Sequence, residues 1–305
     1  MENKQLTGHI LALVTVLFWG TTFISTKILL NDFSPVEIQF YRFIIGLAAL
    51  AVVYPYKMKV ENKKHEVYFA AAGFCGITLC YLLENIALTY TMASNVGVIG
   101  SLVPIFTALI AYIFLKEEPI RSSFFVGFVL AMLGVIFISC STTSTFQVNP
   151  LGDFLALAGT FAWAVYSVFT RKISEFGYNI IQTTRKTFLY GILFLLPILF
   201  LFDFKLEFTR FTNPVALFHF LLLGLGSSAF CYVTWNFAVR ALGPVKTSIY
   251  IYLMPGVTVV VSMIVLNEKI TWLAGLGMLL IFKALYISER KVLAKKKVFQ
   301  NKKAG

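Results

Sequence analysis

The chain has 305 residues, of which 58% are hydrophobic and only 13% are charged. A soluble domain carries about 45–50% apolar and about 25% charged residues, so this chain has too few polar side chains to cover a water-soluble globule. The composition excludes a soluble enzyme, a disordered chain and a fibrous repeat, and it indicates an integral membrane protein. The net charge of +12 suggests nucleic-acid binding, unless the charges have another explanation.

Ten segments of the chain are apolar enough and long enough to cross a membrane, which takes about 20 residues of helix. We expect spans at 6–30, 34–55, 66–90, 93–115, 122–140, 151–170, 179–202, 215–239, 245–266 and 271–288. These runs are too long and too continuously apolar for the alternating strands of about 10 residues that build membrane barrels. The first span is also too long for the core of a signal peptide, so we interpret it as an uncleaved helix.

The lysines and arginines predict which loops stay in the cytoplasm. With the N-terminus inside, 18 of the 26 fall on the inner side, and only Lys205, Arg210 and Lys269 fall outside. Enrichment of basic residues in cytoplasmic loops is a general rule of membrane topology. We therefore expect a multi-pass protein of the cytoplasmic membrane with both termini in the cytoplasm. Its partner is the lipid bilayer, and the nucleic-acid interpretation loses its basis.

The two halves of the chain carry the same pattern. Residues recur at an offset of 151: Tyr81, Asn85, Ala87, Pro104, Leu115 and Glu117 correspond to Tyr232, Asn236, Ala238, Pro255, Leu266 and Glu268. We expect two five-helix repeats, residues 1–145 and 146–305, the second with the basic tail. Because five is odd, the second repeat enters the membrane inverted. Inverted repeats are typical of secondary transporters, whose site lies near the midplane between the repeats; duplication for bundle stability alone is the alternative.

In each half an Asn-x-Ala is followed by a proline and a closing Leu-x-Glu, and Trp19-Gly20 stands in the first span. This arrangement resembles the drug/metabolite transporter superfamily, EamA type, over nearly the whole chain. The resemblance implies an all-α, ten-helix secondary transporter that moves small metabolites, often amino acids or related compounds, commonly outward. It also implies a monomer or a homodimer. Nucleotide-sugar or phosphorylated-metabolite carriers of the same superfamily are the alternative, followed by a channel or scramblase.

Polar side chains inside the spans are the first candidates for a site, because such residues usually face a cavity or a partner. Tyr81, Glu84 and Asn85 share one helical face, and Tyr232 and Asn236 share the equivalent face of the eighth span. We hypothesise that the tyrosines and asparagines hydrogen-bond a polar solute. The alternative is a hydrogen bond between helices that holds the bundle together.

Glu84 has no acidic counterpart, because Trp235 occupies the equivalent position. Burial favours the protonated form of a carboxyl group. Glu84 is therefore the candidate for coupling transport to a proton or for binding a substrate amine. The alternatives are a carboxylate that reaches external water and one that pairs with a lysine such as Lys27 or Lys283.

Further candidates line the other spans. A wall of aromatic and hydroxyl side chains is expected from Trp19, Thr22, Trp163, Tyr166, Tyr250 and Tyr252, with helix packing as the alternative. Arg42 and Arg185 are candidates for coupling or gating, each binding a substrate carboxylate from its own side, unless they are structural arginines that reach toward the interface. Pro104 and Pro255 are candidate hinges, because proline removes a helical hydrogen bond.

No phosphate-binding loop, nucleophile motif or metal-ligand spacing occurs in the sequence. The four cysteines lie within the expected spans, where they are interpreted as small buried hydrophobes. We therefore expect no enzymatic activity, no cofactor and no metal, and a small-molecule metabolite as the partner in solution. A membrane enzyme is the weakest alternative.

Overall fold

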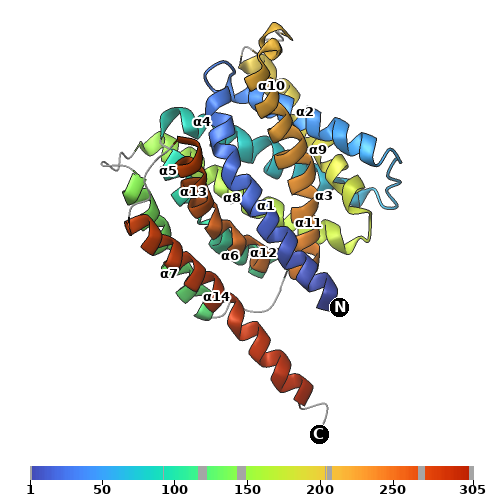
Figure 1. The fold of residues 1–305 in the computed structure, drawn as a ribbon. Coiled ribbons are helices and arrows are strands. Elements are labelled where there is room, and N and C mark those ends of the chain that lie inside the picture. Colours follow the sequence, from blue (N-terminus) through green and yellow to red (C-terminus); the bar gives the residue numbers. More distant parts are fainter. Residues whose placement is uncertain are drawn as a thin grey trace.

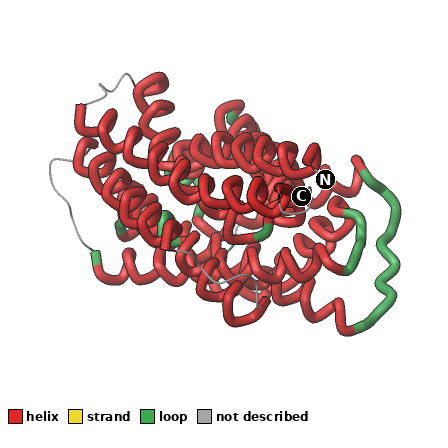
Figure 2. The backbone as a smooth tube through the Cα atoms, turned by 90° about the horizontal axis from the view of Figure 1, so that it is seen from below, coloured by secondary structure: helices red, strands yellow, loops and turns green. Residues whose placement is uncertain are grey.

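The computed structural model describes residues 2–91, 93–115, 122–142, 149–202, 204, 208–266 and 272–301. Within these residues the chain forms helices and short connections and no strand (Figures 1 and 2). Seven helical stretches are long and apolar enough to cross a membrane: Asn3–Leu29, Pro35–Val53, Lys64–Tyr90, Val96–Leu115, Pro150–Glu175, Ile180–Leu201 and Pro214–Leu242. Shorter apolar helices cover Ser122–Ile138 and Gly275–Ser288. The prediction of an all-helical membrane protein is confirmed at this level.

The helices follow the expected segments closely. In the first half they are α1 (Glu2–Leu29), α2 (Pro35–Val53), α3 (Lys64–Gly73), η1 (Phe74–Leu79), α4 (Cys80–Tyr90), α5 (Ala93–Gly100), α6 (Val103–Leu115) and α7 (Ser122–Thr142). In the second half they are α8 (Pro150–Glu175), α9 (Ile180–Leu201), η2 (Phe208–Thr212), α10 (Pro214–Leu221), η3 (Leu222–Phe230), α11 (Cys231–Leu242), α12 (Pro244–Ser248), η4 (Ile249–Leu253), α13 (Met254–Leu266) and α14 (Trp272–Asn301). The expected break at 116–119 lies outside the described residues.

Several helices begin where the sequence supplies a capping asparagine, which a proline follows in α8 and α10. Asn149, Asn179 and Asn213 each accept a hydrogen bond from a backbone N–H of the first turn of α8, α9 and α10, respectively. Such side chains satisfy N–H groups that have no partner within the helix. α12 instead follows Gly243, whose φ of 87° is a conformation that glycine adopts without strain. These signals set where the chain turns back into the bundle.

Three of the long segments are interrupted in their middle. η1 and η3 are π-helical turns inside the stretches Lys64–Tyr90 and Pro214–Leu242. α5 and α6 are separated at Ser101–Leu102, two residues before Pro104, and the 3-10 helix η4 stands two residues before Pro255. Proline is tolerated in the first turn of a helix, where its missing N–H would have no partner. Both prolines therefore restart a helix after an interruption.

The helices pack so that the middle of α1, α4, α8 and α11 meets in one core. α1 lies against α11 and α13, α4 lies against α8, and α2 lies against η3. α7 and α14 form a closely packed pair with each other. α10 lies at the end of the molecule opposite both chain termini (Figure 1).

Candidate functional site

The centre of the bundle is a cluster of six aromatic side chains from four helices, here called the central aromatic cluster. Its members are Trp19 (α1), Tyr81 (α4), Trp163 and Tyr166 (α8), and Tyr232 and Trp235 (α11), all buried. The ring of Trp19 lies 5.2 Å from that of Trp163, edge to face, and 5.1 Å from that of Trp235. The rings of Tyr81 and Tyr232 are 6.5 Å apart. Five of the six are predicted site residues, which the structure brings together; Trp235 was not among the predicted site residues.

Two indole N–H groups of this cluster have no hydrogen-bond partner among the described residues. They belong to Trp163 and Trp235, and both nitrogens are buried. In contrast, Trp19 donates to the carbonyl of Ser227 at 3.0 Å, and the Tyr232 hydroxyl donates to the carbonyl of Gly76 at 2.9 Å. Both carbonyls belong to the π-helical turns, which are frequent at functional sites. Because buried donors are nearly always paired, the two unpartnered indoles are suited to a polar ligand.

Asn236 links the cluster to helix α9. Its side-chain oxygen accepts a hydrogen bond from the Tyr166 hydroxyl at 2.7 Å, and its side-chain nitrogen donates to the Thr184 hydroxyl at 2.9 Å. Asn85, its counterpart, instead donates to the carbonyl of Pro35 at 3.2 Å and so ties α4 to the start of α2. In this structure both amides make interhelical hydrogen bonds.

A small, open pocket with a cavity volume of about 20 Å³ lies between α8, α9 and α11. Its lining is rich in hydroxyl groups and consists of Thr170, Ile173, Ser174, Tyr178, Ile180, Thr183, Thr187, Asn236 and Arg240. We call this side of the molecule the Tyr178 end. Asn236 belongs both to the pocket and, through Tyr166, to the hydrogen-bonded edge of the central aromatic cluster. The pocket therefore leads from the Tyr178 end toward the cluster.

Arg42 is a buried cation beside the cluster, with 2% of its surface exposed. It donates to the hydroxyls of Ser228 and Ser227 at 3.1 and 2.7 Å, and its guanidinium lies 4.3 Å from the centre of the Tyr81 ring. It makes no ion pair with any described residue. A buried charge is normally paired, so Arg42 is equipped to take an anionic group.

Glu84 lies on α4 one turn beyond Tyr81 and is half-buried. Among the described residues it has no hydrogen-bond partner and no ion pair. Lys27 and Lys283, suggested as partners, are both exposed and do not pair with it. The lysine-paired interpretation of Glu84 is therefore wrong in this structure.

The other predicted site residues make hydrogen bonds outside the six side chains of the central aromatic cluster or have a buried hydroxyl without a described partner. Arg185 donates to the carbonyls of Tyr54 and Tyr56, which hold the loop between α2 and α3. The hydroxyl of Tyr250 is 2.7 Å from Nδ1 of His9, whereas the buried Tyr252 hydroxyl has no partner among the described residues. The Thr22 hydroxyl donates to the carbonyl of Trp19 at 2.7 Å. The hydrogen bonds from Arg185 to the loop carbonyls favour a structural role for this residue.

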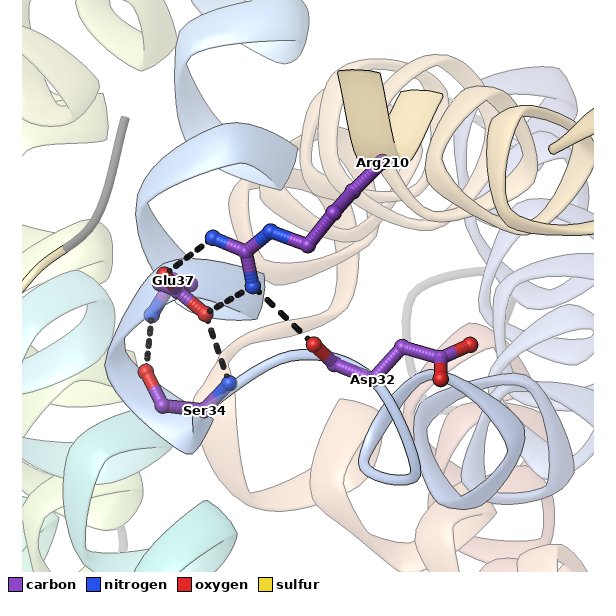
Figure 3. A network of polar contacts seen from close by, with 4 residues as sticks. All are labelled: Asp32, Ser34, Glu37 and Arg210. Carbon is purple, nitrogen blue, oxygen red and sulfur yellow. Dashed lines mark hydrogen bonds and ion pairs between the residues drawn. The ribbon is translucent and has the colours of Figure 1, made fainter. Parts of the chain in front are cut away.

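The opposite side of the molecule, here called the Arg210 end, is held by a polar network that the sequence analysis missed. Arg210 of η2 makes two hydrogen bonds to the carboxylate of Glu37 on α2, at 2.7 and 3.1 Å, and a third to the carbonyl of Asp32 (Figure 3). Glu37 also forms a capping box with Ser34, each side chain bonding the other's backbone N–H (Figure 3). The Ser-x-x-Glu spacing before an apolar run was a visible signal for the cap, but nothing in the sequence indicated Arg210 as its partner.

A bundle of apolar helices with a buried polar and aromatic centre defines a multi-pass membrane protein. The sequence matches the EamA-like transporter family over residues 6–140 and again over residues 150–289, and the chain belongs to that family. Membership confirms the resemblance found from the sequence motifs. The family and the relatives below are transporters.

The chain is similar to known proteins along nearly its full length. It is 28% identical over 287 residues to an uncharacterized transporter of Archaeoglobus fulgidus, covering 93% of this chain and 97% of that one. It is 28% identical to the uncharacterized transporter YyaM of Bacillus subtilis, covering 85% and 86%. A probable terminal-alkyne amino-acid exporter of Streptantibioticus cattleyicolor is 25% identical, covering 96% and 97%. One crystal structure shares the fold with a TM-score of 0.77 at 16% identity, covering 93% of this chain and 98% of that chain.

Proposed function

We propose that this protein is a secondary active transporter that moves small metabolites, amino acids or related compounds first among them, out of the cell by alternating access. The observation that carries the proposal is the hydroxyl-lined pocket whose Asn236 is bonded to Tyr166 of the central aromatic cluster. Ligand sites are mostly apolar cavities with a few placed polar groups. The central aromatic cluster supplies the apolar part of such a site, and the pocket beside it supplies polar groups.

We infer that the helices form two inverted repeats of five, residues 1–145 and 146–305, making ten spans. The separate matches of the two halves to one family support this inference. The π-helical turns support it too, because Phe74–Leu79 shifted by 151 residues falls within Leu222–Phe230. Interrupted helices in equivalent positions of two halves are the expected pointer to a transporter site.

We place the Tyr178 end in the cytoplasm and the Arg210 end outside. Basic residues support this orientation, because the loop of residues 54–63 and the side chains of Arg171, Lys172 and Arg240 belong to the Tyr178 end. Cytoplasmic loops carry an excess of such residues. Both chain termini then lie in the cytoplasm, and the pocket is open to solutes inside the cell, as an exporter requires.

The substrate class follows from the charges and rings near the centre. A carboxylate fits Arg42, an apolar side chain fits the aromatic cluster, and an amine gains cation–π attraction from the same rings. The relative named as an amino-acid exporter supports this choice. A phosphate site that uses both Arg42 and Arg185 has less support, because Arg185 is engaged by the loop carbonyls of Tyr54 and Tyr56.

The test begins with a thermal-shift screen of the purified protein against the twenty amino acids, aromatic amines, purine nucleosides and sugar phosphates. A ligand that binds only the folded state raises the unfolding temperature. The hit is then used in counterflow with proteoliposomes. Substrate inside the vesicles should accelerate uptake of labelled substrate, which a channel or scramblase does not show. Flux without this stimulation would contradict the carrier mechanism, and a hit among sugar phosphates alone would favour the phosphorylated-metabolite carrier.

A further inference from the structure

We propose that the ion pair between Glu37 and Arg210 is the external gate of the transporter, closed in this structure and broken once in every transport cycle. This inference rests on the alternating-access function proposed above. It assigns a role to two charged residues that lie outside the central aromatic cluster and the pocket.

The pair joins two connections that are far apart in the sequence. Glu37 stands in the first turn of α2 and its side chain is 5% exposed; Arg210 belongs to η2, between α9 and α10, and its side chain is 21% exposed. The two hydrogen bonds between them and the third to the Asp32 carbonyl hold η2 over the turn between α1 and α2 (Figure 3). Each connection belongs to a different half of the chain, so the contact spans the two halves.

An aromatic layer lies directly beside the ion pair. The Arg210 guanidinium is 4.7 Å from the centre of the Phe33 ring, which packs edge to face on Phe220 at 4.8 Å. Tyr41 packs on Phe211 of η2 at 4.8 Å. Ala216 of α10 is buried in the same group of side chains. Moving η2 away from α2 therefore uncovers an apolar layer as well as the ion pair.

The energetics of the pair favour a gate. A buried ion pair contributes little net stability, because the attraction between the charges is offset by the loss of their hydration. If η2 and α2 separate, both charges regain water, so the pair opens at small net cost. Removing one charge takes away the attraction that offsets the burial of the other, which favours the separated state. Closure at the Arg210 end accompanies an open pocket at the Tyr178 end, as alternating access requires.

The control is the ion pair between Lys186 of α9 and Glu66 of α3, at 2.6 Å; its lysine is 21% exposed, as Arg210 is, and its glutamate is 33% exposed. It does not join η2 to α2. Glu37→Gln is a well-suited variant, because glutamine preserves the capping box while it removes the charge. Arg210→Gln removes the other charge, and the double exchange Glu37→Arg with Arg210→Glu restores a pair of opposite charges.

The experiment measures thiol labelling in a background where Cys75, Cys80, Cys140 and Cys231 are replaced by alanine. One reporter, Ala216→Cys, lies beneath the gate, and the other, Thr187→Cys, lines the pocket. A membrane-impermeant maleimide is applied to intact cells for the first reporter and to inside-out vesicles for the second. We expect Glu37→Gln and Arg210→Gln to raise labelling at 216 and to lower labelling at 187, each about fivefold, because the population shifts between two states. Lys186→Gln should change neither.

A local loosening of the loop would raise labelling at position 216 and leave position 187 unchanged, and that result overturns the proposal. Equal labelling of all variants at both positions overturns it too. If a single-charge variant is not recovered as a folded protein, the double exchange tests the proposal instead. A gate predicts that the double exchange returns labelling at positions 216 and 187 toward the values of the parent protein. Labelling needs no substrate, so it is separate from counterflow by the parent protein. If counterflow is absent but labelling still rises at position 216 and falls at position 187, the transport proposal is rejected. The gate between two conformations is then still supported.

Discussion

Arg42 and Arg185 stand at equivalent positions in the two halves of the chain but have different surroundings. Arg42 is buried in the core, where its guanidinium bonds two serine hydroxyls and lies over the rings of Tyr81 and Phe43. Arg185 lies near a helix end and binds loop carbonyls. Sequence symmetry predicted equal roles for the two arginines, whereas the structure separates a core cation from one that fastens a loop.

This difference predicts opposite effects of the same substitution. Arg42→Gln should lower transport at least about tenfold, because loss of a buried charged contact to a ligand costs about 2–5 kcal/mol. Arg185→Gln should leave transport within about twofold and increase protease cleavage in the loop of residues 54–63, whose carbonyls it releases. Uptake into proteoliposomes and limited proteolysis measure the two effects. Equal loss of transport in both variants would show that Arg42 and Arg185 have the same role, as their equivalent positions in the sequence suggested.

A further prediction concerns Glu84 and whether transport is coupled to a proton. Its side chain is half-buried and makes no hydrogen bond or ion pair with any described residue, so no described partner has to be displaced when the carboxylate takes a proton. Glu84→Gln imitates the protonated form permanently. If a proton on Glu84 drives transport, the variant should lose the pH dependence of uptake while it still binds substrate in the thermal-shift assay. An unchanged rate and pH profile in Glu84→Gln rejects the proton role.

The limits of sequence reasoning are clearest for these residues. Periodicity placed Tyr81 and Tyr232 on facing surfaces, and their rings do lie close together. The same reasoning gave the two asparagines one shared role, but Asn85 bonds the Pro35 carbonyl and Asn236 bonds Tyr166 and Thr184. A helical pattern predicts which face a side chain is on, not which of several nearby partners it reaches. The Arg210 contact depends on how η2 folds back, which local pattern does not determine.

At the scale of whole elements, apolar length predicted the positions of the helices well, because a span needs only a local run of apolar residues. The interruptions were harder to predict. Pro104 and Pro255, expected as hinges within continuous spans, stand in the first turns of α6 and α13, where each follows an interruption. The π-helical turns η1 and η3 had no sequence signal, because they arise from packing between helices and from side chains that bond their carbonyls. We therefore expect that such turns can be predicted only when the positions of the neighbouring helices are known.

The contact between α7 and α14 gives a prediction at this scale. A Cβ atom on Gly277 would lie 2.5 Å from the backbone oxygen of Gly134, whereas a Cβ on Gly275 would meet no atom within 4 Å. Backbone cannot yield as a flexible side chain does. Gly277→Ala should therefore lower the free energy of unfolding by about 1–3 kcal/mol, and Gly275→Ala should not lower it. Thermal unfolding in detergent compares the two. Equal stability would show that the helix pair relaxes freely.

For the whole molecule, the orientation in the membrane decides whether the pocket serves export. The fold alone does not set the orientation, since the proposed inverted repeats would look similar from both sides; the prediction depends on the basic residues. In the cysteine-free background, Thr212→Cys reports on the Arg210 end and Lys59→Cys on the Tyr178 end, and both positions are exposed. An impermeant maleimide added to intact cells should label position 212 and not position 59, and in inside-out vesicles the pattern should reverse. The opposite pattern would place the pocket outside the cell, and the same geometry would then describe an importer.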